Sequence, residues 1–147
     1  MRPGIQFKLL SPGDGDGFLS YYLTLSNGET TTSFGFYGYN DEFRDFAQHL
    51  DSFPRSSSQV VTHQVGNDDP EWAYFLELEV FCYEPNGTSA IRVRGWSGKQ
   101  ASYHSQVPAY QHFEFFIPTL PADLNRLGQG LSSWNPLDEA EFTWSAT

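Results

Sequence analysis

Residues 72–96 read WAYFLELEVFCYEPNGTSAIRVRGW, two runs of alternating apolar and polar residues on either side of Asn86-Gly87. Such alternation is typical of β-strands with one buried face, and Asn-Gly is a strong signal for a hairpin turn. A two-residue loop would give the opposed pairs Val80–Val93, Cys82–Ile91, Glu79–Arg94 and Phe81–Arg92. The pattern therefore predicts an antiparallel hairpin with an apolar face and a charged face.

Two helices are predicted on either side of this hairpin. The first follows Asn40, a good N-cap, and ends at Pro54, because the residue before a proline avoids the α region. Its apolar stripe is Phe43, Phe46, Ala47, Leu50 and Phe53. The second begins near Pro121, ends at Pro136 and carries a stripe of Leu124, Leu127, Leu131 and Trp134. Gly128 and Gly130 weaken this helix unless they permit a close approach to the sheet.

The remaining strands complete an α+β fold. They are expected at residues 4–10, 18–25, 29–37, 59–65 and 110–117. The order β-β-β-α-β-β-β-β-α, with short connections, predicts a mostly antiparallel sheet of about six to eight strands. Both helices would pack on one face, and the other face would stay partly open. We expect a single domain over residues 1–147, with 137–147 as an edge strand or a loose tail.

The overall charge bears on the class of partner. The chain has 147 residues and a formal net charge of -10, from 18 acidic against 8 basic residues. Such a balance disfavours nucleic acid and anionic membranes, since both are bound by clustered Lys and Arg. It suits a basic protein partner. Cys82 is the single cysteine, and the first ten residues are too polar for a signal peptide. We therefore expect a cytoplasmic protein that binds neither nucleic acid nor membrane.

Motifs for catalysis are missing from the sequence. It has no nucleophile elbow, no His-Glu-x-x-His, no paired cysteines and no phosphate-binding glycine loop. We accordingly predict no catalytic residue, no cofactor and no metal. One alternative stays open, a small-molecule or metal-dependent enzyme with a pocket beside residues 97–109. Its lining would be His104, His112 and Glu114, and His63 could join them.

The charged side of the central hairpin is the candidate binding surface. Its predicted members are Phe75, Glu77, Glu79, Phe81, Arg92, Arg94, Trp96, His112 and Glu114. A cross-strand ladder of ion pairs would explain these residues without any ligand. Aromatic residues and arginine are also enriched at binding hot spots, which favours an interaction surface. A homodimer that buries Phe75, Phe81 and Trp96 is a further possibility.

Three segments carry a resemblance to a known family: DEFRDFAQHLDSFP at 41–54, WAYFLELEVFCYE with its return SAIRVRGW, and FEFFIPTLPADLNRLGQGL at 113–131. In the order of these elements, over residues 21–134, the chain resembles small acidic bacterial immunity-type proteins such as the WapI-like immunity family. Those proteins neutralise a cognate toxin by binding it. The resemblance implies a non-enzymatic binding protein and assigns a role to no individual residue.

Overall fold

A computed structural model describes residues 1–98 and 109–146. In that part of the chain, eight strands and two helices follow the order β-β-β-α-β-β-β-β-α-β. Their bounds are β1 Gly4–Ser11, β2 Leu19–Ser26, β3 Thr31–Gly38, α1 Arg44–Asp51, β4 Val60–Gly66, β5 Tyr74–Cys82, β6 Ser89–Gly98, β7 Ala109–Thr119, α2 Pro121–Ser133 and β8 Glu141–Ser145. The predicted α+β class and element order are confirmed, and the tail adds the edge strand β8.

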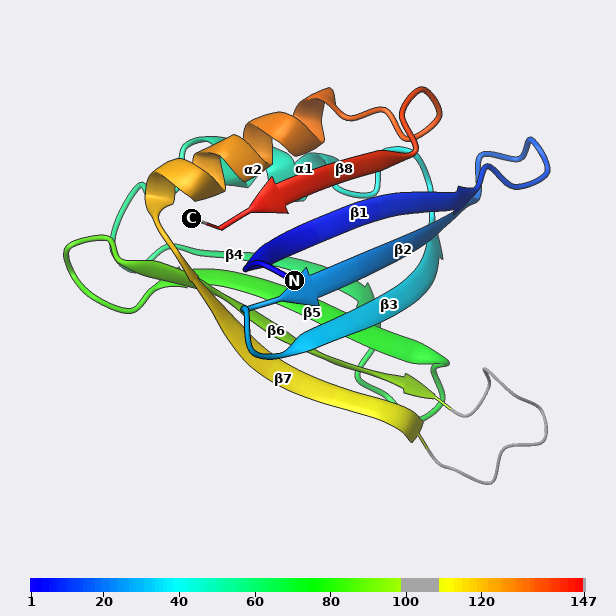
Figure 1. Cartoon of the computed structure of the whole chain (residues 1–147), viewed down its shortest axis with the longest axis horizontal. Helices are drawn as coiled ribbons and strands as arrows, with labels where there is room; N and C mark the ends of the chain where they lie inside the picture. The colour runs from blue at the N-terminus through cyan, green and yellow to red at the C-terminus, as the bar shows by residue number, and fades with distance from the viewer. Residues whose placement is uncertain (99–108, 147) are drawn as a thin grey trace.

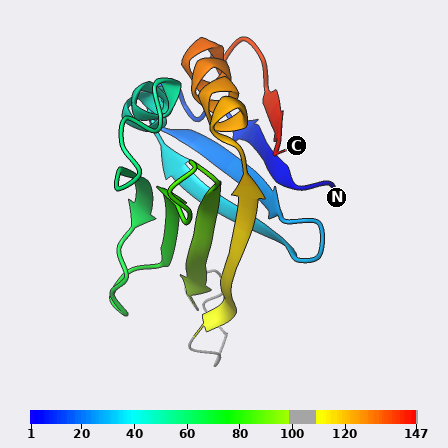
Figure 2. The same ribbon diagram turned by 90° about the vertical axis from the view of Figure 1, so that its left-hand side faces the viewer.

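The strands form two sheets instead of the single sheet expected. Sheet A has the order β3-β2-β1-β8 and sheet B the order β4-β5-β6-β7, and every strand pairing is antiparallel. The two sheets cross at an angle, and both helices lie on the same side of the molecule (Figures 1 and 2). A split sheet lets two apolar faces cover each other, whereas one eight-stranded sheet would need far more helix to cover it.

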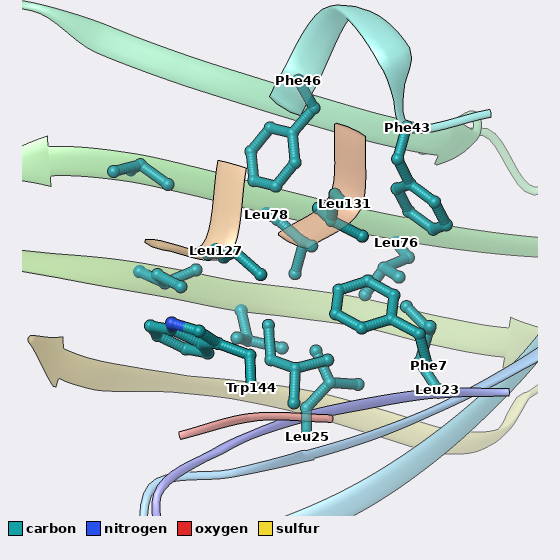
Figure 3. Close-up of a cluster of buried hydrophobic side chains, with 14 of the residues drawn as sticks. Phe7, Leu23, Leu25, Phe43, Phe46, Leu76, Leu78, Leu127, Leu131 and Trp144 are labelled. Carbon is teal, nitrogen blue, oxygen red and sulfur yellow. The ribbon is translucent and has the colours of Figure 1, made fainter. Parts of the chain in front are cut away.

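One apolar core lies between the two sheets and the helix pair. Phe7 and Leu23 of sheet A, Leu76 and Leu78 of sheet B, and Leu127 of α2 point toward one another (Figure 3). All five are essentially inaccessible to water. Inward and outward side chains alternate along β2 and β5, as the sequence predicted. On the outer faces, side chains such as Lys8 and Tyr22 of sheet A and Glu114 of sheet B are exposed.

The central hairpin has the predicted faces but a different register. Glu79 lies opposite Arg92, Glu77 opposite Arg94 and Val80 opposite Ile91, a shift of two residues from the two-residue loop. Pro85 explains the shift, because in that loop it would have to donate a backbone N–H that proline lacks. The last paired residue is instead Tyr83, whose N–H donates to Thr88 O at 2.9 Å. A shift of two leaves every side chain on its predicted face.

α1 begins later than predicted, and α2 packs closely against a different element than predicted. α1 starts at Arg44 and not directly after Asn40, and its N-cap Phe43 makes no side-chain capping bond. Gly128 of α2 does allow a close approach, but to α1 and not to a sheet. A Cβ built there would lie 2.7 Å from Ala47 O and 2.9 Å from Leu50 Cβ. In the part of the chain that the structure describes, neither helix is long and apolar enough to cross a membrane.

Candidate functional site

All nine predicted surface residues have their positions on the outer side of sheet B, and we call this surface the charged face. Strand β7 lies beside β6, so that His112 is opposite Trp96 and Glu114 is opposite Arg94. On the other side of β6, Arg94 faces Glu77. Three neighbouring strands therefore contribute to one surface. Phe75 is the exception in burial, since it is only 2% exposed and lies beneath the charged groups.

Arg94 lies at the centre of the charged face. Its Nε donates to Glu77 Oε1 at 2.8 Å, and its guanidinium carbon lies 5.1 Å from the ring centroid of Phe75. The hydrogen bond to Glu77 and the surrounding carboxylates raise the pKa of Arg94 above its ordinary value. The Glu77 side chain is only 13% exposed, so this pair is screened less than an ordinary surface ion pair.

Asp68, in the loop before β5, joins the charged face although the sequence did not indicate it. Its Oδ1 accepts a hydrogen bond from Trp96 Nε1 at 3.0 Å, and its Oδ2 lies 3.6 Å from a terminal nitrogen of Arg94. The loop carboxylate thus holds the Trp96 indole and the Arg94 guanidinium side by side. Asp68 reaches the charged face only because this loop lies against β6. The alternation of residues within a strand does not indicate which loop will lie against it.

The part of the charged face around Arg92 is more exposed than the part around Arg94. One carboxylate there, that of Glu79, has no cationic partner among the described residues. Arg92 donates through Nε to Glu114 Oε2 at 2.8 Å, and the Glu114 side chain is 51% exposed. Glu79 faces Arg92 across the strands but makes no ion pair with any residue that the structure describes. Cross-strand ion pairing is therefore real, but it is incomplete. The unmatched carboxylate gives this end of the face a negative charge.

An apolar spot adjoins these charges. Phe81 and Phe116 meet edge to face with ring centroids 6.1 Å apart. Phe116 is 46% exposed and Val60, at the start of β4, is 55% exposed. Phe116 was not among the predicted residues, although it shares its side of β7 with His112 and Glu114 and could have been found from that alternation. Exposed aromatic side chains are enriched at protein interfaces.

A shallow hollow of about 300 Å³ opens within the charged face. Its lining is Asp68, Phe75, Arg92, Arg94, Gly95, Trp96, His112, Phe113 and Glu114. The Arg94 and Arg92 guanidinium groups both border it, and each is already bound by a carboxylate. The hollow is thus lined both by arginines and by carboxylates that bind them.

The alternative enzyme site is not assembled by the described residues. His104 lies outside them, whereas His112 and Glu114 do share the charged face. His63 does not join, because its side chain is on the inner face of sheet B, with Nε2 3.0 Å from Glu42 Oε2 and the Phe43 ring centroid 4.9 Å away. Within residues 1–98 and 109–146, no group of three or more metal-binding side chains is found.

The Arg94–Glu77 pair gives a first prediction. Arg94→Met is expected to lower the free energy of unfolding by about 1–2 kcal/mol, because a nearly buried Glu77 carboxylate loses its charged hydrogen bond. Urea unfolding followed by circular dichroism measures the change. Arg92→Met is the matched control on the same strand, with an expected loss below about 1 kcal/mol, since its partner Glu114 is half exposed. Equal losses would show that burial of Glu77 is irrelevant.

No protein-family model matches the chain, and no curated protein matches it. Among solved structures it is similar to WHY3 from Arabidopsis thaliana, with 13% sequence identity and a TM-score of 0.43 over 86% of this chain and 76% of that one. The likeness is too remote to indicate what this chain binds.

The expectation that the chain binds no nucleic acid needs correction on physical grounds. Net charge alone does not exclude nucleic acid as a partner, so that exclusion is withdrawn. The physical reason is that net charge sums over the whole chain, whereas binding depends on the charge and the aromatic groups of one face.

Proposed function

We propose that the chain is a non-enzymatic binding protein and that the charged face is its interface with a basic partner protein. The observation that carries this proposal is the combination on one sheet face of exposed aromatic side chains and carboxylates in excess of arginines. Asp68, Glu77, Glu79 and Glu114 outnumber Arg92 and Arg94 there. A toxin inhibitor of the immunity type is the most concrete form of such a protein.

Charge and packing would have separate roles in this interface. The chain as a whole carries a net charge of -10, which attracts a basic partner over distances up to the screening length and speeds encounter. Phe116 and Val60 would then be buried, and buried aromatics supply most of the affinity of an interface. Glu79 would gain the cationic neighbour that it does not have among the described residues of the chain.

The test is a capture experiment followed by a measured affinity. The tagged protein is mixed with lysate of its source organism, and proteins that elute between about 50 mM and 500 mM salt, the range over which screening becomes severe, are identified and purified. Isothermal titration then gives the dissociation constant for the wild type and for variants. We expect Glu79→Lys and Phe116→Ala each to raise it at least about tenfold.

Asp14→Lys is the matched control for the charge change. Asp14 is exposed in the loop between β1 and β2, remote from sheet B, so its reversal alters the net charge by the same amount without touching the charged face (Figure 1). Its affinity should stay within about twofold of the wild-type value. If Asp14→Lys and Glu79→Lys weaken binding equally, general attraction and not the charged face accounts for the complex, and the proposal fails.

A further inference from the structure

A second and larger hollow, of about 640 Å³, lies apart from the charged face. It is bounded on one side by the edge strand β3 with its neighbour β2, and on the other by the ends of β5, β6 and β7. Its lining includes Ser20, Tyr22, Gly35, Tyr37, Ser97 and Gln111. No charged side chain is among the lining residues that the structure describes, in a chain in which 18% of residues are charged.

On either side of Gly35, side chains of sheet B form hydrogen bonds to the edge of β3 that faces away from β2. Gln111 Nε2 donates to the Ser33 carbonyl at 2.9 Å, and the Tyr37 N–H donates to the Tyr74 hydroxyl at 3.4 Å. In an antiparallel strand, alternate residues direct their backbone groups to the same side. The N–H and C=O of Gly35 therefore also point away from β2 and toward the hollow. Side chains thus pair with the Ser33 carbonyl and the Tyr37 N–H, and the N–H and C=O of Gly35 point the same way between them.

Gly35 is not required by the fold. It does not have a positive φ, and a Cβ built on it would meet nothing nearer than Tyr22 Cδ1 at 3.6 Å, which is ordinary contact. Gly98 differs, since its Cβ would lie 2.8 Å from Ala73 O. A glycine within a strand is destabilising by about 0.5–1 kcal/mol relative to alanine, and it marks places where a ligand approaches the backbone closely. The missing side chain of Gly35 leaves one side of the Tyr22 ring open.

The chemistry of the lining selects a class of ligand. Among the lining residues that the structure describes there is no cation to bind phosphate or carboxylate, and no carboxylate to bind a cation or a metal. A purely aliphatic ligand would desolvate the hydroxyls of Ser20 and Ser97 without giving them a partner. The rings of Tyr22 and Tyr37, which are 37% and 56% exposed, offer flat apolar surfaces beside these hydroxyls. A neutral ligand with apolar ring faces and many hydroxyl groups satisfies both requirements.

We infer that this hollow is a binding site for a neutral carbohydrate, with one pyranose ring against Tyr22 at Gly35 and its hydroxyls bound by serine side chains and the Gln111 amide oxygen. Its volume is within the range of ligand pockets. Sugar rings place C–H groups on the aromatic face and hydroxyls at the rim, which is the arrangement of the lining. The site is separate from the charged face, so it stands or fails independently of the proposed function.

The test is titration of the whole protein with a panel of neutral di- and trisaccharides built from glucose, galactose, mannose and N-acetylglucosamine, followed by amide chemical shifts. We expect at least one saccharide to shift the amides of β3 and of Gln111. Gly35→Val fills the open side of Tyr22 and keeps good strand propensity, so it should fold normally yet weaken binding at least about tenfold. Tyr22→Ala should weaken it similarly by removing the ring.

Control variants and a control ligand distinguish binding at this site from nonspecific binding. Tyr83→Ala removes another exposed tyrosine, in the loop between β5 and β6, and should leave the affinity unchanged. Thermal unfolding of Gly35→Val should show a midpoint no lower than that of the wild type. Adenosine is included as a neutral planar ligand. Absence of shifts with every saccharide, shifts with adenosine alone, or wild-type affinity in both Gly35→Val and Tyr22→Ala would each overturn the inference.

Discussion

Trp144→Ala is expected to lower the free energy of unfolding by about 3–5 kcal/mol, the range for removing a large buried aromatic side chain. Trp144 is 1% exposed, and its indole Nε1 donates to the Asp123 carbonyl at 2.8 Å. The side chain belongs to β8 and projects into the core beside Leu127 of α2 (Figure 3). The substitution thus leaves a cavity and also removes the bond between the last strand and the first turn of α2. Urea unfolding monitored by circular dichroism measures the loss.

Trp72→Ala is the control for the Trp144 substitution. Trp72 is 47% exposed in the loop before β5, so its removal should change the free energy of unfolding by less than about 1 kcal/mol. A loss at Trp144 no larger than the loss at Trp72 would mean that β8 does not contribute to the core as the structure has it.

Gly128→Ala is expected to lower the free energy of unfolding by about 3 kcal/mol, the upper end of the usual range for overpacking. On helix propensity alone, alanine should stabilise α2 by up to about 1 kcal/mol. The added Cβ would however lie 2.7 Å from Ala47 O and 2.9 Å from Asp51 N, and backbone atoms of α1 cannot rotate away as a side chain can. The two helices would have to separate, which opens the core beneath them.

Gln129→Ala provides the comparison for Gly128→Ala, because Gln129 is the next residue of α2 and is exposed. It should be neutral or slightly stabilising, by at most about 0.5 kcal/mol. Thermal and urea unfolding of both variants give the comparison. Stabilisation by Gly128→Ala would contradict the close approach of α1 and α2, since propensity would then exceed the clash.

The faces of the central hairpin could be predicted from sequence, while its register could not. Strand alternation has a period of two, so any even shift preserves which side chains are buried. Asn86-Gly87 indicated a two-residue loop, whereas the absent N–H of Pro85 moved the last pair back to Tyr83 and Thr88. The identity of the ion pairs changed with the register, from Glu79–Arg94 to Glu77–Arg94.

The local sequence pattern did not predict the division of the strands into two sheets. A strand's alternation tells which of its faces is buried but not which strand lies beside it. β8 pairs with β1, although almost the whole chain separates Trp144 from its partner Ile5. The charged face could be found because its predicted members come from consecutive strands. Asp68 and the hollow beside Gly35 could not, since both depend on segments that come together only in the folded chain.

The pairing of β1 with β8 also determines the order in which the protein can fold. β1 is synthesised well before β8, so one of its edges has no strand partner until residues 141–145 have followed. Sheet B needs only neighbouring strands, so its contacts close over short loops and form early. We therefore expect the pairing of β8 with β1 to be the last step in forming the sheets. Until then β1 is an unprotected edge strand, the kind of segment from which aggregation begins.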